Sequence, residues 1–196
     1  MAEGESEEGE FLGTEAGGEQ FSRKFEGRLV RHTVSIDDEA IVGELSRKGY
    51  GDREGKLLSL KLYEALHLVR LGWLSVKGPR TKEVSFEDLV KRSLAENSMG
   101  WTKFLVYRDL RSRGYVVREG YSLAADLRIY PRGEYGKNPA KYVVIPINEG
   151  GDVRMSRLQK IIDTVYRMGK EPIIAVVERR GEAIYYRASK MVFEGP

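Results

Sequence analysis

The sequence predicts an α+β protein with two parts, and three observations lead to this class. Between residues 23 and 80, short strand and helix signals alternate. A polar joint at residues 79–82 then interrupts the pattern. After two further helices, residues 115–187 are rich in strand signals and contain a single helix. We therefore expect a small mixed N-terminal α/β domain and a C-terminal domain with a central mixed sheet flanked by helices.

In the N-terminal part, residues 27–34 read as the first strand. The segment 35–38 (SIDD) resembles the start of a capped helix, and the apolar stripe of Ile41, Val42 and Leu45 continues it. The pattern then predicts a turn at residues 49–52, a strand at 57–60, a helix at 62–71 ended by Gly72, and a strand at 73–76.

Helix signals dominate the start of the C-terminal part. The segment 85–88 (SFED) predicts a capped start for a helix that continues to about Asn97. A second helix covers residues 101–112 and ends at Gly114, because glycine readily adopts the left-handed conformation that follows many helices. The later strands are predicted at about residues 115–119, 126–130, 141–147, 173–177 and 183–187, with one helix at about 156–168.

Composition excludes several classes of protein. The chain contains no cysteine, which excludes disulfides and thiolate metal sites. Its apolar runs are far shorter than the roughly 20 residues of a membrane-spanning helix. The acidic, glycine-rich start also lacks the basic and apolar regions of a signal peptide. We therefore expect a cytoplasmic protein without a membrane partner.

Charge is distributed unevenly along the chain. Residues 1–20 hold seven glutamates and no basic residue, whereas the remainder carries 33 basic and 23 acidic residues, a net charge of +10. A basic body suggests a polyanionic partner, nucleic acid first, with an ordinary charged surface as the alternative. Because residues 1–22 have almost no apolar content, we expect a disordered acidic tail there, followed by domains at 23–80 and 81–196.

Motifs in both halves of the chain resemble one known family. In the C-terminal half, YRDLRSRGYVV (107–117) precedes ADLRIY (125–130) and AKYVV (140–144). In the N-terminal half, KGYG (48–51) precedes GKLLSLKLYEALHL (55–68). Together these motifs resemble archaeal tRNA-splicing endonucleases over about residues 26–190. The resemblance implies a nuclease-like C-terminal domain and a precursor tRNA as the RNA partner.

The family's chemistry implies a degenerate active site in this chain. In that family a 2′-hydroxyl attacks the adjacent phosphate without any metal or cofactor, leaving a 2′,3′-cyclic phosphate and a 5′-hydroxyl. Tyrosine, histidine and lysine serve as base, acid and cation. The tyrosine corresponds to Tyr130. The histidine corresponds to Pro139, or to Asn138 if a gap moves by one, and neither is a proton donor near neutral pH. The lysine corresponds to Arg167 if the family's pattern is aligned from the start of the predicted helix at Ser156. It corresponds to Lys170 if residues are counted back from the strand at 173–177.

Some archaea build this enzyme from two copies each of a catalytic and a structural chain, and the present chain is similar to the structural one. The resemblance implies a homologous catalytic partner, which this chain contacts through a hairpin loop and its C-terminal strand. In the family the hairpin loop is acidic, whereas here Arg179 and Arg180 stand between Glu178 and Glu182. The partner-binding candidates are Glu178, Glu182, Tyr185, Met191, Val192 and Phe193. The candidate RNA-binding cations are Arg128, Lys160, Arg167, Lys170 and Arg187.

Three alternatives stay open. A restriction-type magnesium nuclease would use Asp126 and Glu149, although Gly151 stands where that motif needs a lysine. A stand-alone RNA-binding protein on a degenerate nuclease fold is the second alternative, although the chain has no recognisable platform motif for single-stranded RNA. The third is an active endonuclease with a non-standard site.

Overall fold

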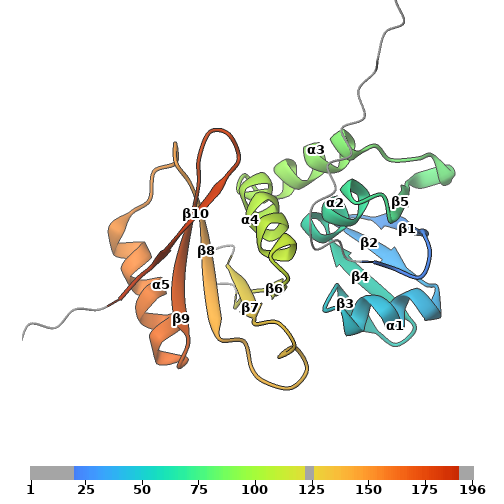
Figure 1. The fold of residues 1–196 in the computed structure, drawn as a ribbon. Helices are drawn as coiled ribbons and strands as arrows, with labels where there is room; N and C mark the ends of the chain where they lie inside the picture. The colour runs from blue at the N-terminus through green and yellow to red at the C-terminus, as the bar shows by residue number, and fades with distance from the viewer. Residues whose placement is uncertain (1–19, 122–125, 190–196) are drawn as a thin grey trace, which may run out of the picture.

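The computed structural model describes residues 20–121 and 126–189, which form two domains, each built around a five-stranded sheet (Figure 1). The order of strands is β3-β4-β2-β1-β5 in the N-terminal sheet and β10-β9-β8-β7-β6 in the C-terminal sheet. The predicted α+β class is confirmed. Within the described parts of the chain, no helix is long and apolar enough to cross a membrane.

The N-terminal domain follows the predicted order of elements closely. Asp38 caps the first helix, since its carboxylate accepts from the Ile41 amide at 3.2 Å, whereas Ser35, the first residue of the expected capping box, lies in β2. The elements are β1 (Phe25–Val30), β2 (Thr33–Ile36), α1 (Glu39–Arg47), β3 (Asp52–Glu54), β4 (Leu57–Lys61), α2 (Leu62–Arg70) and β5 (Leu74–Lys77).

The single strand predicted over residues 27–34 is wrong, because the chain forms a hairpin in which β1 and β2 pair antiparallel. The turn lies at Arg31 and His32, and Arg31 has a positive φ of 52°. The Thr33 hydroxyl donates to the Val30 carbonyl at 3.2 Å across this turn. The turn contains no Gly, Pro, Asn or Asp, so the sequence carries no usual turn signal there.

Two helices follow the N-terminal sheet, and the strands of the second sheet come after them. Ser85 caps the first helix by accepting from the Asp88 amide at 3.1 Å. After the 3-10 turn η1 (Pro79–Thr81), the elements are α3 (Phe86–Glu96), α4 (Gly100–Ser112), β6 (Val116–Glu119), β7 (Leu127–Tyr130), β8 (Tyr142–Asn148), α5 (Met155–Arg167), β9 (Glu171–Val177) and β10 (Ala183–Arg187).

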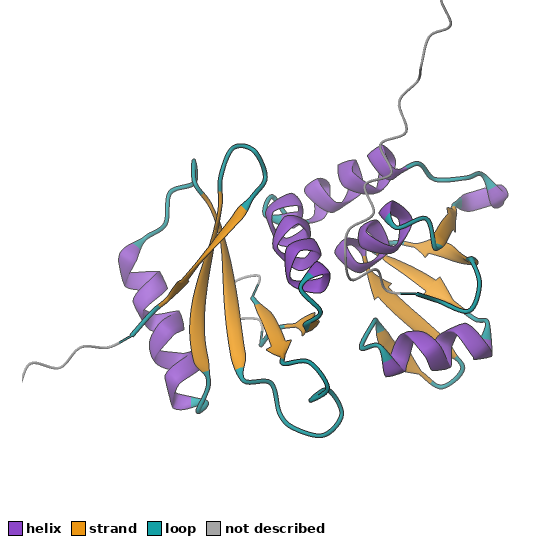
Figure 2. Cartoon of the chain, viewed as in Figure 1, coloured by secondary structure: helices purple, strands orange, loops and turns teal. Residues whose placement is uncertain are grey.

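Helices cover both faces of the C-terminal sheet, with α5 on one side and α4 on the other (Figure 2). Val143 and Ile145 of β8 pack against apolar residues of α5, such as Ile161. The opposite face, which includes Ile129 and Ala175, belongs to the larger core that also contains residues of α4. In β8 and β9, alternate side chains therefore lie in two separate cores.

The two domains share this larger core and a polar contact around residues 48–52. Arg111 on α4 donates to a carbonyl of that turn at 3.0 Å, and Arg118 on β6 donates to two more. Gly49 has a φ of +75°, and a Cβ there would lie 2.3 Å from Val116 Cγ1. Glycine tolerates both the positive φ and the close approach of Val116, so Gly49 allows the turn to pack against β6.

The folded N-terminal domain begins before residue 23. Phe21 is buried, and its ring lies 5.6 Å from that of Phe25 and 5.5 Å from that of Trp73. The Ser22 hydroxyl donates to Glu44 at 2.9 Å. The expected acidic tail otherwise lies outside the described residues.

Candidate functional site

Three positions identified from the resemblance lie at one end of the C-terminal sheet. β7 runs antiparallel to β8, so Tyr130 at the end of β7 lies beside the start of β8. β8 runs parallel to β9, so the starts of these two strands are neighbours. Pro139 shortly precedes β8, and Lys170 directly precedes β9. The topology thus brings Tyr130, Pro139 and Lys170 to the same end of the sheet.

The two candidates for the lysine position lie in different surroundings. Lys170 Nζ donates to the carbonyl of Ala140, next to Pro139, at 2.7 Å. Arg167 stays exposed in the last turn of α5, where it donates to the Thr164 hydroxyl at 2.9 Å. Of the two cations, Lys170 is therefore the one in contact with the segment that carries Pro139.

Tyr130 and Asn138 are held by neighbours in the loop between β7 and β8. The Tyr130 ring packs edge-on against Tyr135, with centroids 5.1 Å apart. The Asn138 side chain is exposed and donates to the Glu134 carboxylate at 3.3 Å. Pro139 is exposed as well, so its side chain fills no cavity in the core.

Both histidines of the chain lie in the N-terminal domain. His32 is in the β1–β2 turn, with Nδ1 3.7 Å from the Glu96 carboxylate. His67 is buried in α2, where its ring lies 6.4 Å from Tyr50 and 5.5 Å from Tyr107. Burial, with the charges of Arg111 and two other arginines, lowers the pKa of His67 to about 3. Because the sequence contains only these two histidines, no histidine is available at the sheet end.

A stack of aromatic and cationic groups, which the sequence did not suggest, lies beside Lys170. Arg128 Cζ lies 5.2 Å from the ring centre of Tyr121, and Lys170 Nζ lies 5.8 Å from the same centre. Arg128 also donates to the Glu119 carbonyl at 2.6 Å. These residues come from three separate segments, so no local motif could have indicated the stack.

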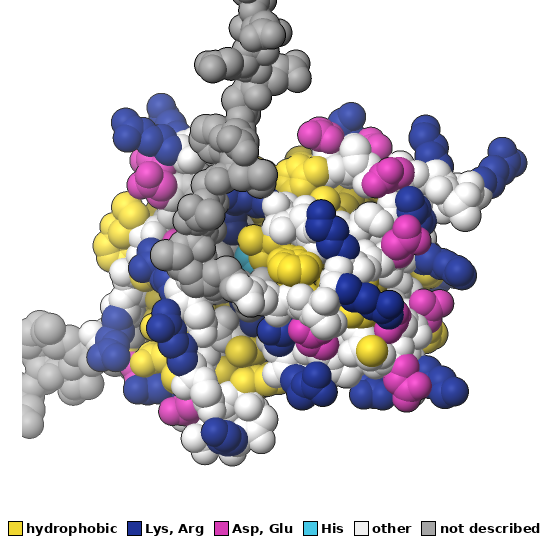
Figure 3. Space-filling view, turned by 45° about the vertical axis from the view of Figure 1, so that its right-hand side comes forward, with side chains coloured by type: hydrophobic (Ala, Val, Ile, Leu, Met, Phe, Trp, Pro, Cys, Tyr) yellow, Lys and Arg dark blue, Asp and Glu magenta, His cyan; other side chains and the backbone are white. Residues whose placement is uncertain are grey.

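The other candidate RNA-binding cations are exposed. Lys160 lies on α5, and Arg187 lies at the end of β10, where it pairs with Glu171 at 2.6 Å. Figure 3 shows that lysine and arginine side chains are spread over one face of the molecule, with acidic side chains between them. Charge alone therefore does not outline a single RNA-binding patch on that face.

The hairpin between β9 and β10 carries the predicted acidic loop. The Glu178 carboxylate accepts from the Arg180 amide at 2.7 Å, so it caps its own turn. Glu182 is exposed. The Gly181 carbonyl accepts from Arg108 of α4 at 3.2 Å, which ties the tip of the hairpin to the body of the domain.

Along β10, alternate side chains point to opposite faces of the sheet. The Tyr185 hydroxyl donates to Asp109 of α4 at 2.7 Å, so Tyr185 faces its own domain. Burial and that contact raise its pKa well above the usual value. Its neighbours Ile184 and Tyr186 are 49% and 52% exposed. Three further candidates, Met191, Val192 and Phe193, lie outside the described residues.

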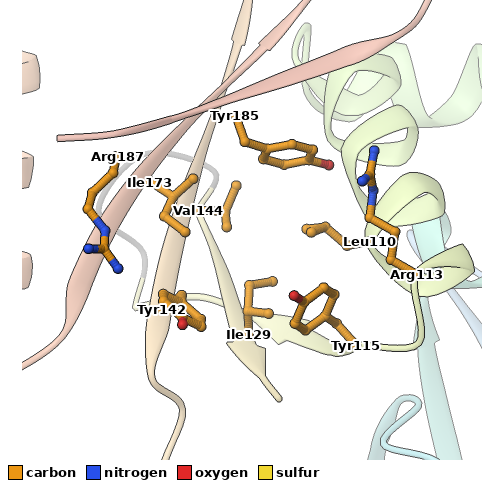
Figure 4. Close-up of a pocket in the computed structure, with 9 residues that line it drawn as sticks. All are labelled: Leu110, Arg113, Tyr115, Ile129, Tyr142, Val144, Ile173, Tyr185 and Arg187. Atoms are coloured by element: carbon orange, nitrogen blue, oxygen red, sulfur yellow. The ribbon is translucent and has the colours of Figure 1, made fainter. Parts of the chain in front are cut away.

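A cleft of about 310 Å³ lies between the end of α4 and the adjacent face of the sheet (Figure 4). Its floor is apolar and its rim carries tyrosines and arginines. The lining residues are Leu110, Arg113, Tyr115, Ile129, Tyr142, Val144, Ile173, Tyr185 and Arg187.

Asp126, the first residue of the metal-nuclease alternative, has a structural contact. Asp126 is buried, and its carboxylate accepts from the Tyr121 amide at 2.6 Å within the β6–β7 connection. The amide of Glu149 donates to the Val177 carbonyl at 3.0 Å, just beyond β8. Among residues 20–121 and 126–189, no three His, Asp or Glu side chains are grouped so that they could hold a metal ion.

Tyrosines and cations gathered at the end of a mixed sheet, on a basic body, are features of a protein that acts on nucleic acid. Comparison with known families agrees with this class. Residues 25–90 match the family described as tRNA intron endonuclease, N-terminal domain, and residues 100–186 match tRNA intron endonuclease, catalytic C-terminal domain. The chain belongs to the tRNA intron endonuclease family, as the motifs indicated.

Several archaeal relatives are similar over most of their length. The tRNA-splicing endonuclease of Methanococcus vannielii is 31% identical over 81% of this chain and 90% of its own. The corresponding enzyme of Methanothermobacter thermautotrophicus is 31% identical over 83% of this chain and 95% of its own. That of Pyrococcus furiosus is 30% identical over 71% and 80%, respectively.

Proposed function

We propose that this chain is the structural, non-catalytic subunit of a tRNA-splicing endonuclease. The observation that carries the proposal is Pro139 at the position of the family's histidine. Proline has neither a titratable side chain nor a backbone N–H. With His32 and His67 both in the N-terminal domain, the sheet end lacks the imidazole that would protonate the leaving oxygen.

The remaining groups at the sheet end support this proposal. We infer that Lys170 occupies the family's lysine position, because its ammonium contacts the Ala140 carbonyl beside Pro139. That contact directs one donor of the ammonium to the protein's own backbone. Tyr130 packs on Tyr135, which gives its ring a structural role without any chemistry. The sheet end thus has two of the family's three catalytic groups, the tyrosine and the lysine. Both contact the loop between β7 and β8 and stabilise it.

The proposed partner surface on β10 rests on its position in the sheet. β10 is an edge strand, so among residues 20–121 and 126–189 no strand pairs with its outer backbone groups. Ile184 and Tyr186 are exposed on the side of the strand away from Tyr185. An edge strand with exposed apolar side chains favours pairing with another chain. Met191, Val192 and Phe193 stay partner-binding candidates from the sequence alone.

The second proposed partner surface is the hairpin tip, where Glu182 and Glu178 would meet a basic pocket of the catalytic chain. Arg108 holds the tip through the Gly181 carbonyl, so the loop is fixed before docking and loses little entropy on binding. Since the Glu178 carboxylate caps its own turn, Glu182 is the stronger candidate for the intermolecular contact. The exposed cations Lys160, Arg167 and Arg187 are proposed to contact the precursor tRNA.

Reconstitution with a homologous catalytic chain tests the proposal. The purified chain alone should leave precursor tRNA uncut, and the mixture should cut it and show by light scattering a mass of about two copies of each chain. Truncation after Lys190, or the double change Glu178→Lys with Glu182→Lys, should reduce both mass and cleavage. Cleavage by the chain alone at the rate of an ordinary member of the family would refute the proposal, and normal assembly of both variants would refute its mechanism.

A further inference from the structure

The cleft beside α4 has the side chains of a site for a flat, aromatic ligand. The rings of Tyr115, Tyr142 and Tyr185 surround its floor, which includes Val144 and Ile173 (Figure 4). All three tyrosines are partly exposed, so ring surface remains accessible from the cleft. Its volume of about 310 Å³ lies at the small end of the range for small-molecule sites, which is roughly 300–1,000 Å³.

Arginines stand at the two ends of this cleft. Arg113 and Arg187 lie on opposite sides in Figure 4. Asp109 accepts from Arg113 Nε at 2.8 Å and from Nη2 at 3.2 Å, and Glu171 holds Arg187 at 2.6 Å. A guanidinium carries five N–H donors, so each carboxylate fixes its arginine in place while leaving further donors for an anion.

The combination of rings and cations favours a nucleotide over an amino-acid side chain. Bases stack on aromatic rings through either face, and arginine binds the adjoining phosphate. A base is available for stacking only where it is unpaired, so duplex RNA would not enter. Strands β7 to β9 line the cleft, and the same strands meet at the sheet end that holds Tyr130 and Lys170. The cleft residues Ile129 and Tyr142 lie on the face of the sheet that packs against α4.

We propose that this cleft binds one unpaired nucleotide of RNA, with the base stacked on Tyr142 and Tyr185 and a phosphate held by Arg187. The inference rests on the proposed function for its ligand, because it takes RNA as the molecule that this family acts on. It adds a defined contact for the RNA in a chain without the catalytic histidine.

Binding by the full chain without its partner tests the cleft separately. The probe is a labelled single-stranded RNA ten-mer that contains 2-aminopurine, measured by anisotropy and by quenching of the base analogue. Tyr142→Ala should weaken binding about 5- to 150-fold and reduce quenching, as expected for the loss of one stacked base. Tyr142→Phe keeps the ring and should bind within about twofold of the parent.

A charge variant gives a second measurement that does not alter the core. Arg187 is exposed, so Arg187→Gln should fold normally, weaken binding, and lower the slope of log affinity against log salt by about 0.7, the value for one phosphate of a single strand. Arg47→Gln, which removes an exposed arginine from α1, is the matched control and should leave the slope of the parent.

Competition identifies the source of the ligand. Unlabelled ten-mer should displace the probe, whereas AMP and blunt duplex RNA should displace it poorly. Equal competition by AMP would overturn the RNA assignment in favour of a free nucleotide. If Tyr142→Ala and Arg187→Gln leave RNA binding unchanged, the proposal is wrong, whatever reconstitution shows. A loss of complex mass with the catalytic chain, without loss of RNA binding, would mark the cleft as a protein-docking site instead.

Discussion

The burial of His67 makes the stability of this protein depend on pH in a predictable way. The His67 side chain, which belongs to α2, is buried among Tyr50, Tyr107 and Arg111, and its pKa is lowered from 6.5 to about 3. In the unfolded chain His67 takes up a proton as the pH falls through about 6.5, whereas in the folded protein it stays neutral until about pH 3. The unfolded state therefore binds more protons in this window, and the free energy of unfolding falls as the pH is lowered.

The size of this effect follows from the same two pKa values. Each pH unit within the window costs up to about 1.4 kcal/mol, so lowering the pH from about 7 to about 5 removes about 2 kcal/mol. Glu64 acts in the opposite direction, because burial raises the pKa of its carboxyl group in the folded state above 4.5. The contribution of His67 must therefore be read from the difference between the parent and a variant.

Urea unfolding at the two pH values, for the parent and for His67→Phe, isolates the contribution. The variant keeps an aromatic ring but cannot titrate, so its loss of stability between the two pH values should be smaller than that of the parent by about 2 kcal/mol. His32→Gln, at an exposed histidine, should behave like the parent. A difference below about 0.5 kcal/mol between the parent and His67→Phe would refute the assignment of His67 as a buried neutral group.

Two predictions concern the sheet end. In the assembled enzyme Tyr130→Phe should leave cleavage within about twofold, because the ring contact with Tyr135 remains, whereas loss of a working catalytic base would cost about 10²–10⁴-fold. Lys170→Met should lower the free energy of unfolding by about 1–2 kcal/mol in urea titrations, since the bond to the Ala140 carbonyl is lost, while Arg167→Met on the exposed turn of α5 should change it little. Equal losses for the two Met variants would argue against a special contact of Lys170.

Local signals in the sequence predicted most of the secondary structure. The cap at Ser85 was predicted correctly, because its hydroxyl accepts from the amide three residues on, whereas the first helix is capped by Asp38 and not by Ser35. The strands of the C-terminal sheet were found to within two residues, since each contains at least two residues of the β-branched, aromatic or aliphatic types that favour strands. The hairpin at Arg31 was missed because its turn uses none of the residues that normally mark one. The short strand β3 was missed too, since all three of its residues are exposed and polar.

The candidate site was only partly predictable. The positions of Tyr130 and Pro139 came from motifs, but counting along the chain could not decide between Arg167 and Lys170. The contact that favours Lys170 joins residues 30 positions apart. The cleft was not predicted at all, because its lining comes from α4 and from four strands and the loop before them. Such a site depends on tertiary packing, for which a single sequence holds no local signal.

The contacts at the sheet end bear on the proposed structural role of this chain. Pro139 is exposed, so its side chain contributes little to the core. Tyr130 and Lys170 each have a second role, the first through the ring of Tyr135 and the second through the carbonyl of Ala140. If catalysis were lost and the fold still needed, the position with only a chemical role would change first, and positions with structural contacts would stay. This combination of contacts at Tyr130 and Lys170, with Pro139 exposed, supports the proposal that the chain is a supporting subunit.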